Sequence, residues 1–203
     1  EAKEELGITL QLNPAQSDAY ANFGHIHFRQ EHWNKAIEEF DHAIALGSNK
    51  PDTYYFAGLA RSKQKAYGEA IPFLQKAVRL RSHKASYHFY LGNAFRHLGS
   101  FDEALQEFRR TLEIQPMHSQ AQNNIGVIFW NLKAYERAEI AFKKALDIQQ
   151  DLPDIHQNLA ALHLKNNRYA DAIPYLVQVL KLQPGNATAR KLLDHAQMQK
   201  GPS

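Results

Sequence analysis

The sequence predicts an all-α protein, a solenoid of tandem helix–turn–helix repeats. Two observations predict this fold class. The 203-residue chain repeats with a period of 34 residues, without insertion or deletion, from Ser17 to Asn186. Within the second half of each period, apolar residues recur three or four apart, as in a helix with one buried face. Because one such repeat cannot bury its apolar face alone, we expect the repeats to stack on one another.

Four columns of the repeat explain how its two helices would pack. Position 8 is Gly in four repeats and Ala in the fifth, and position 20 is Ala in all five, so two helices could approach closely there. Position 17 is always aromatic and position 24 is always large and apolar, which would fill the space between the helices. The residues at positions 8 and 24 are, in order, Gly24 and Phe40, Gly58 and Leu74, Gly92 and Phe108, Gly126 and Phe142, and Ala160 and Leu176.

The period divides the chain into five complete repeats, with a turn expected near positions 14–16 of each. We number them repeat 1 (17–50), repeat 2 (51–84), repeat 3 (85–118), repeat 4 (119–152) and repeat 5 (153–186). Pro51 and Pro153 begin their repeats, where a helix needs no N–H donor. Pro72 and Pro174 lie near the start of a second helix, and we expect them to fall in its first turn, where the missing N–H costs little.

Both flanks continue the pattern. Ala2 and Leu6 fall on positions 20 and 24 of a preceding repeat, so residues 1–16 are expected to form the second helix of a truncated repeat. Residues 187–203 are expected to be a C-terminal capping helix and tail, with Asn186 as the N-cap. The chain has no N-terminal Met and no signal-peptide pattern, so we expect a fragment or a processed product.

These columns resemble the tetratricopeptide repeat (TPR), a helix–turn–helix unit, over residues 17–186. The resemblance implies a right-handed superhelix whose concave face is lined by the first helix of each repeat. The chain departs from the family at position 11, where Tyr is usual. That column holds His27, Arg61, Phe95, Phe129 and His163. We expect looser local packing at this position, most of all at Arg61.

Composition excludes several classes of protein. The formal net charge of +3 is too small to indicate a nucleic-acid partner, and no apolar run approaches the roughly 18–20 residues of a membrane span. The basic pairs Arg109-Arg110 and Lys143-Lys144 stand among acidic residues, which indicates a mixed-charge surface rather than an RNA-binding face. The absence of cysteine rules out disulfides and thiolate metal sites, and it is compatible with the cytoplasm, which we favour, or the periplasm.

No catalytic, cofactor or metal site is expected. The sequence has no glycine-rich phosphate loop, no dinucleotide fingerprint and no His-Glu-x-x-His motif. Ser and His both occur, but no spacing brings them into a nucleophile–base arrangement. We therefore expect a chain that is not an enzyme by itself. A substrate-selecting arm of a larger multidomain protein remains an alternative.

By the resemblance, positions 2, 5, 6, 9, 12 and 13 of each first helix would face a peptide-binding groove. Asparagine recurs at position 6, and its amide can pair with both sides of a peptide group. Aromatic residues are frequent on this face, and basic residues recur at position 13. The predicted binding residues are Asn22, Phe28, Arg29, Phe56, Lys63, Tyr90, Asn93, Arg96, Asn124, Trp130, Asn158 and Lys165. Tyr55 and Phe89 also stand at groove positions, and for these two residues the alternative to binding is packing under the neighbouring repeat.

The partner expected from this face is a peptide or protein segment with acidic residues and apolar anchors. A two-cation carboxylate clamp, by which co-chaperones of the family hold a chain terminus, is not expected, because Phe89, Asp154 and Asn158 stand where it needs cations. The chain is thus expected to be a non-catalytic scaffold or adaptor. The rival is self-association through the half repeat, whose Leu6, Leu10 and Leu12 would expose an apolar edge.

Overall fold

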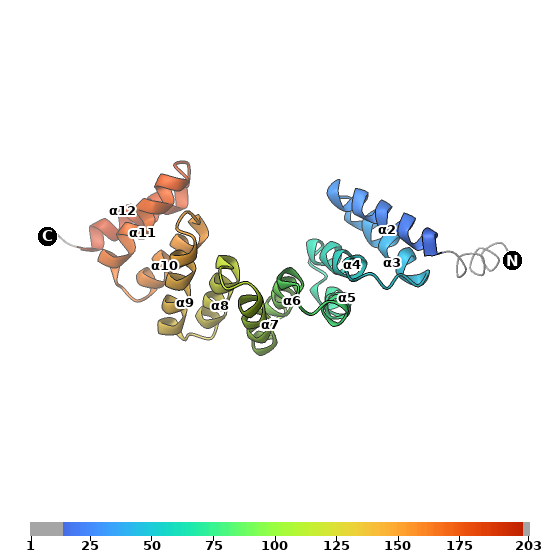
Figure 1. The fold of residues 1–203 in the computed structure, drawn as a ribbon. Helices are drawn as coiled ribbons and strands as arrows, with labels where there is room; N and C mark the ends of the chain where they lie inside the picture. The colour runs from blue at the N-terminus through green and yellow to red at the C-terminus, as the bar shows by residue number, and fades with distance from the viewer. Residues whose placement is uncertain (1–13, 201–203) are drawn as a thin grey trace. The chain divides into compact units, whose positions relative to one another are not determined.

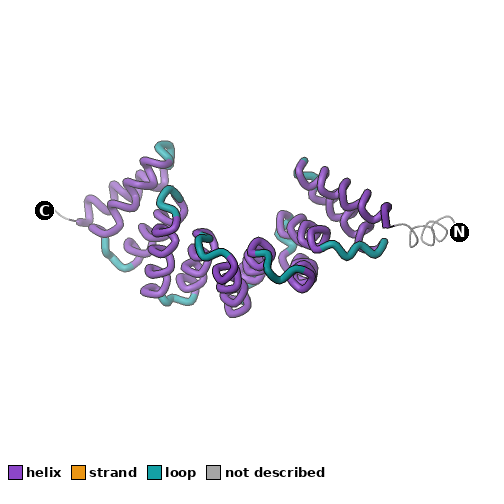
Figure 2. Tube along the Cα trace, viewed as in Figure 1, coloured by secondary structure: helices purple, strands orange, loops and turns teal. Residues whose placement is uncertain are grey.

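A computed structural model describes residues 14–200, and in this part of the chain helices are joined by short turns and loops (Figures 1 and 2). It contains eleven α-helices and no strand, which confirms the all-α fold of tandem helix–turn–helix repeats. The helices form two compact units, an N-terminal unit that ends at Ile114 and a C-terminal unit that begins at Gln115. Of the half repeat predicted over residues 1–16, residues 1–13 with Leu6, Leu10 and Leu12 lie outside the described residues. Residues 14–16 instead begin the first helix of repeat 1, because that helix starts at Pro14, so this boundary of the prediction is wrong.

Each repeat contributes one pair of helices joined by a short turn. In the N-terminal unit the helices are α2 (Pro14–Arg29), α3 (Trp33–Ala45), α4 (Pro51–Lys63), α5 (Tyr67–Leu80), α6 (Ala85–His97) and α7 (Phe101–Ile114). In the C-terminal unit they are α8 (Ser119–Asn131), α9 (Tyr135–Ile148), α10 (Pro153–Lys165), α11 (Tyr169–Leu182) and α12 (Ala187–Lys200). Asn186 caps α12, because its Oδ1 accepts a hydrogen bond from the Ala189 N–H at 2.9 Å.

The glycine at position 8 makes room for a side chain of the second helix. A Cβ added to Gly126 would lie 2.5 Å from two carbons of the Phe142 ring, and one added to Gly24 would lie 2.7 Å from the Phe40 ring. Such distances are far inside van der Waals contact, so the ring at position 24 occupies the space that a side chain at position 8 would need. The alanines of position 20 are fully buried in all five repeats.

All five first helices end in the same turn, in which position 15 adopts a left-handed backbone conformation. The φ values there are 60° at Glu31, 64° at Lys65, 78° at Gly99, 59° at Lys133 and 57° at Asn167. In each repeat the N–H of position 16 donates to the carbonyl of position 11, as from Ala134 to Phe129 at 2.9 Å. This is the Schellman motif, which satisfies carbonyls that a helix end would otherwise leave free.

Two prolines lie deeper in their helices than expected. Pro72 and Pro174 are the sixth residues of α5 and α11, beyond the first turn, so their predicted placement is wrong. The helices nevertheless continue through both. The carbonyls deprived of a donor are those of Gly68 and Ala170, four residues earlier, and both of these residues are exposed, so water can hydrate them.

Arg61 does not loosen the packing at position 11, contrary to the expectation. It is only 7% exposed, and its Nη2 donates to both carboxylate oxygens of Asp41, at 2.7 and 2.9 Å. Nη1 donates to the Ala57 carbonyl at 3.2 Å, and the guanidinium lies 4.0 Å from the centre of the Phe73 ring. A buried guanidinium is tolerated because its donors and its charge are matched in this way.

None of the helices in residues 14–200 has the length and apolar character needed to cross a bilayer.

Candidate functional site

The first-helix face of the N-terminal unit contains a cleft of about 240 Å³, which we call the Arg96 cleft. Four of the twelve residues predicted from the sequence line it. Its walls come from three helices: Leu59, Ser62 and Lys63 of α4, Tyr67 of α5, and Tyr90, Asn93, Ala94, Arg96 and His97 of α6. The structure therefore brings Lys63, Tyr90, Asn93 and Arg96 together.

The Arg96 cleft is positively charged, and no carboxylate lines it. Arg96 is half-buried, its Nε is buried without a hydrogen-bond partner in the described residues, and its Nη2 donates to His97 Nε2 at 3.1 Å. Burial lowers the pKa of Arg96. Burial, followed by the charge of Arg96, lowers the pKa of His97, consistent with an unprotonated Nε2 that accepts this hydrogen bond. A cation held in this way without a counter-ion favours an anionic ligand.

Tyr67 was not predicted as a binding residue, although it shapes the Arg96 cleft. Its ring stacks on the His97 ring with centroids 4.2 Å apart and planes 3° from parallel, which holds the imidazole beside Arg96. Position 17 is the aromatic packing column of the repeat, so nothing in the sequence pattern placed Tyr67 beside a ligand. The signal that could have found it is the histidine at position 13 of the next repeat, opposite this ring.

A second cleft, of about 370 Å³, lies on the first-helix face of the C-terminal unit, and we call it the Trp130 cleft. It is lined by Val127, Trp130, Asn131, Phe142, Asn158 and Ala161. Trp130 is half-buried and meets the Tyr135 ring edge to face, with centroids 5.7 Å apart. Asn158 Nδ2 donates to Asn123 Oδ1 at 3.0 Å, so this amide links neighbouring repeats and keeps a second N–H for a ligand.

The other predicted residues lie outside these two clefts. Phe28 and Phe56 are half-buried, and their rings pack against each other with centroids 5.2 Å apart. Asn22, Arg29 and Lys165 are exposed, and Asn124 is half-buried. Tyr55 and Phe89 are 9% and 8% exposed, so they pack under neighbouring side chains, the alternative given for them above.

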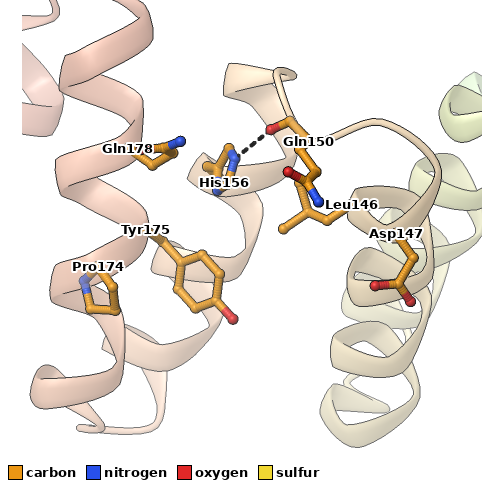
Figure 3. Close-up of a pocket in the computed structure, with 7 residues that line it drawn as sticks. All are labelled: Leu146, Asp147, Gln150, His156, Pro174, Tyr175 and Gln178. Atoms are coloured by element: carbon orange, nitrogen blue, oxygen red, sulfur yellow. Dashed lines mark hydrogen bonds between the residues drawn. The ribbon is translucent and has the colours of Figure 1, made fainter.

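A third cleft, of about 330 Å³, was not predicted at all, and we call it the His156 cleft (Figure 3). Its lining residues are Leu146 and Asp147 of α9, Gln150, His156 of α10, and Pro174, Tyr175 and Gln178 of α11. Figure 3 shows Tyr175 and Gln178 on one side, Leu146 and Asp147 on the other, and His156 between them. None of these residues occupies a groove position of the repeat. The recurrence of histidine at position 4, as His88 and His156, was the available signal.

Within residues 14–200, no group of three or more His, Asp or Glu side chains is arranged to hold a metal ion.

Comparison with known proteins agrees with the repeat pattern. A sequence model of the tetratricopeptide repeat matches residues 21–85, 74–116 and 89–153, and a second model of the same description matches residues 130–193. No relative among the curated proteins matches the chain.

Several solved structures share the fold. MamA from Desulfovibrio magneticus RS-1 is 18% identical, with a TM-score of 0.76, over 85% of this chain and 97% of that one. PilF of Pseudomonas aeruginosa is 18% identical, with a TM-score of 0.74, over 91% of this chain and 90% of that one. YrrB, described as a TPR protein with an unusual peptide-binding site, is 21% identical, with a TM-score of 0.71, over 94% and 96%. At these identities the likeness shows the fold alone.

Proposed function

Because the chain belongs to the tetratricopeptide repeat family, whose fold generally serves as a scaffold for protein–protein interaction, we propose that it is a non-catalytic adaptor. It binds a peptide or protein segment on the first-helix faces of its repeats. The observation that carries the proposal is the Arg96 cleft, where residues chosen from groove positions surround a cationic space without a carboxylate. YrrB, which has this fold, is described as having a peptide-binding site.

The Arg96 cleft suits an acidic side chain of the bound segment. Arg96 and Lys63 supply the positive charge, and partial burial of Arg96 reduces the screening of its charge by water. Leu59, Tyr67 and Tyr90 offer apolar surface for the methylene groups of Asp or Glu and for a neighbouring apolar residue. Asn93 can hydrogen-bond the peptide backbone beside that side chain.

The Trp130 cleft suits an apolar anchor of such a segment. The indole is half-buried and held by Tyr135, so a ligand that covers it buries a large aromatic surface at a small entropic cost. Asn158 provides a backbone hydrogen bond beside the indole. Six further residues at groove positions of the first helices remain predicted contacts: Asn22, Asn124, Arg29, Lys165, Phe28 and Phe56.

Affinity capture from a nuclease-treated lysate of the source cells tests this proposal. The bait is the full chain as wild type, as Arg96→Gln with Lys63→Gln, as Trp130→Ala, and as Arg29→Gln, a matched control that changes an exposed arginine outside both clefts. We expect a protein that the wild type and the control recover and that the cleft variants recover weakly. Equal recovery by all baits would contradict the proposed sites, and circular dichroism shows whether each bait is folded.

Self-association is a second candidate, favoured by an apolar edge on α2. Phe23 and Ile26, at positions 7 and 10, are 55% and 49% exposed. In repeats 2 to 5 the same two columns are buried, with Ala57, Leu91, Ile125 and Leu159 at position 7 and Ala60, Ala94, Ile128 and Leu162 at position 10. Light scattering at increasing protein concentration tests this candidate. A dimer that Phe23→Ser with Ile26→Ser converts to a monomer would support it, and a monomer at every concentration would exclude it.

A further inference from the structure

The His156 cleft differs from its counterpart two repeats earlier by one missing hydrogen bond. His88 and His156 both stand at position 4, and the Nε2 of each donates to a backbone carbonyl six residues earlier, that of Ser82 at 2.9 Å and that of Gln150 at 2.8 Å. His88 Nδ1 lies 2.6 Å from Glu107 Oε2. His156 is 8% exposed, and its Nδ1 is buried with no partner in the described residues, because Tyr175 stands where repeat 3 has Glu107.

The charges around these two histidines are reversed. Counting by the repeat, Asp147 takes the place of Arg79, and Gln178 takes the place of Arg110. Asp147 is the only charged group among the residues that line the His156 cleft, and it is exposed without an ion-pair partner in residues 14–200. With Nε2–H donated to Gln150, the neutral imidazole of His156 presents Nδ1 as an acceptor. The cleft therefore offers acceptors and one negative charge.

The cations nearest to Asp147 on α9 form no ion pair with it. Lys143, one turn before Asp147, pairs with Glu139 at 2.8 Å, and Lys144, three residues before Asp147, is exposed and forms no ion pair within residues 14–200. Arg168 pairs with the same Glu139 at 2.9 Å and with Asp171 at 2.9 Å. Lys143 and Arg168 are thus matched by Glu139 and Asp171, and since Lys144 does not pair with Asp147 either, this carboxylate can attract a positive group from outside.

Repeat 2 shows how this chain fills a comparable site. There Arg61 lies 4.0 Å from the centre of the ring of Phe73, the position equivalent to Tyr175, and pairs with Asp41 on the second helix of the preceding repeat. Repeat 5 has the ring, Tyr175, and a carboxylate on the preceding second helix, Asp147, which stands one helical turn after the position of Asp41. His163 takes the place of Arg61 at position 11, and its ring stacks on Tyr175 with centroids 5.4 Å apart, so a guanidinium in the His156 cleft would meet Tyr175 from the side of the cleft.

We infer that the His156 cleft receives an arginine side chain from a partner protein. The guanidinium pairs with Asp147, lies against Tyr175 and donates to the amide oxygens of Gln150 and Gln178, while Leu146 and Pro174 cover its aliphatic stem. A guanidinium fits better than an ammonium because its planar set of donors reaches several acceptors and stacks on a ring. The cleft uses no groove position, so the chain can hold this partner and a groove-bound segment at once.

An NMR titration of the full chain with the peptide acetyl-Gly-Arg-Gly-amide tests the inference. We expect saturable shifts of the Tyr175 ring and of the Gln178 side-chain amide, and weaker ones with acetyl-Gly-Lys-Gly-amide. Asp147→Asn should weaken binding about 2–5-fold, the range for an exposed ion pair. Asp151→Asn, a matched control for an exposed carboxylate that does not line the cleft, should leave binding unchanged, and so should Arg96→Gln.

Three results would overturn the inference. One is the absence of saturable shifts with the arginine peptide. Another is equal binding by Asp147→Asn and Asp151→Asn, and the third is equal binding of the lysine peptide. Arg96→Gln changes the Arg96 cleft and leaves the His156 cleft intact. The capture experiment tests the Arg96 cleft and the titration tests the His156 cleft, so a failure of one can be told apart from a failure of the other.

Discussion

At the scale of single residues, the glycine at position 8 is explained by the side chain at position 24 of the second helix, which is a Phe ring in repeats 1, 3 and 4 and Leu74 in repeat 2. The sequence predicted that a small residue was needed there, since the column holds only Gly and Ala. The sequence did not show that the side chain at position 24 is the reason why position 8 must be small. Which residue of the second helix faces position 8 depends on how far that helix is rotated about its axis. Repeat 5, with Ala160 facing Leu176, shows that Ala is accepted beside one leucine, although in repeat 2 a Cβ added to Gly58 would lie 2.7 Å from Leu74 Cγ.

Gly126→Ala should therefore lower the free energy of unfolding by about 1–3 kcal/mol, the usual cost of overpacking a core. The added methyl group has no space because the Phe142 ring already occupies it. Adding Phe142→Leu should restore part of the loss, since the pair then matches repeat 5. Urea denaturation of the three proteins measures both effects. Gly68→Ala is the control, because a Cβ there meets nothing within 4 Å. A Gly126→Ala variant as stable as wild type would contradict this account of position 8.

The left-handed residue at position 15 could not be read from residue types. Only Gly99 and Asn167 belong to the types that favour this conformation, whereas Glu31, Lys65 and Lys133 do not. A turn was predicted near positions 14–16, but its backbone geometry was not. The hydrogen bonds of the Schellman motif and the packing of the following helix impose that geometry whatever the side chain.

At the scale of helices, the buried pair of His88 and Glu107 joins α6 to α7. Burial alone would lower the pKa of His88. The hydrogen bond to Glu107 and the bond to the Ser82 carbonyl outweigh it, so the pKa is raised. A histidine whose folded-state pKa is raised adds stability that is fully present below its unfolded pKa of about 6.5 and is lost as pH rises through the folded value.

Glu107→Gln should thus cost more stability at about pH 5.5 than at about pH 8.5, because only the charged imidazole gains from the carboxylate. At the lower pH we expect a loss of about 1.5–3 kcal/mol, the range for a hydrogen bond to a charged group. Urea denaturation at the two pH values measures it. Glu103→Gln, an exposed carboxylate on the same helix, provides the control. An equal cost at both pH values would show that His88 is not charged in the folded chain.

Helix existence was the easiest part of the fold to predict, because a strict 34-residue period repeats the same apolar pattern five times. The error lay in the depth of Pro72 and Pro174, since a repeat column gives spacing but not the residue at which a helix begins. The error at Arg61 had another cause. Its partners Asp41 and Phe73 lie 20 residues before and 12 residues after it, and no local pattern links them.

At the scale of the whole molecule, the sequence predicted which residues would line the first-helix faces better than which would form clefts. Lys63, Tyr90, Asn93 and Arg96 come together because α4 and α6 are neighbours in adjacent repeats. Tyr67 joins them from a packing column, and a rule based on groove positions could not include it. The His156 cleft escaped prediction because none of its lining residues occupies a groove position of the repeat.

The groove proposal makes one prediction about binding to the molecule as a whole. Raising the ionic strength from about 0.05 M to about 0.5 M should weaken binding of the captured partner, because the Arg96 cleft lacks a carboxylate of its own and salt screens its charge. Calorimetric titration at both salt concentrations measures the dependence. Arg96→Gln should flatten it, whereas Arg29→Gln should change it less. An affinity that is independent of salt would exclude an acidic residue as the main contact.

The contacts between adjacent repeats have a consequence for how such a chain could be rearranged. The repeats look interchangeable by their shared columns, but Asp41 of repeat 1 meets Arg61 of repeat 2, Asn123 of repeat 4 meets Asn158 of repeat 5, and Glu139 of repeat 4 meets Arg168 of repeat 5. Each contact is specific to one junction. Shuffling the order of the repeats would leave the guanidinium of Arg61 buried beside the wrong neighbour. The backbone repeats from unit to unit, but these side-chain contacts fit each repeat only to its own neighbour.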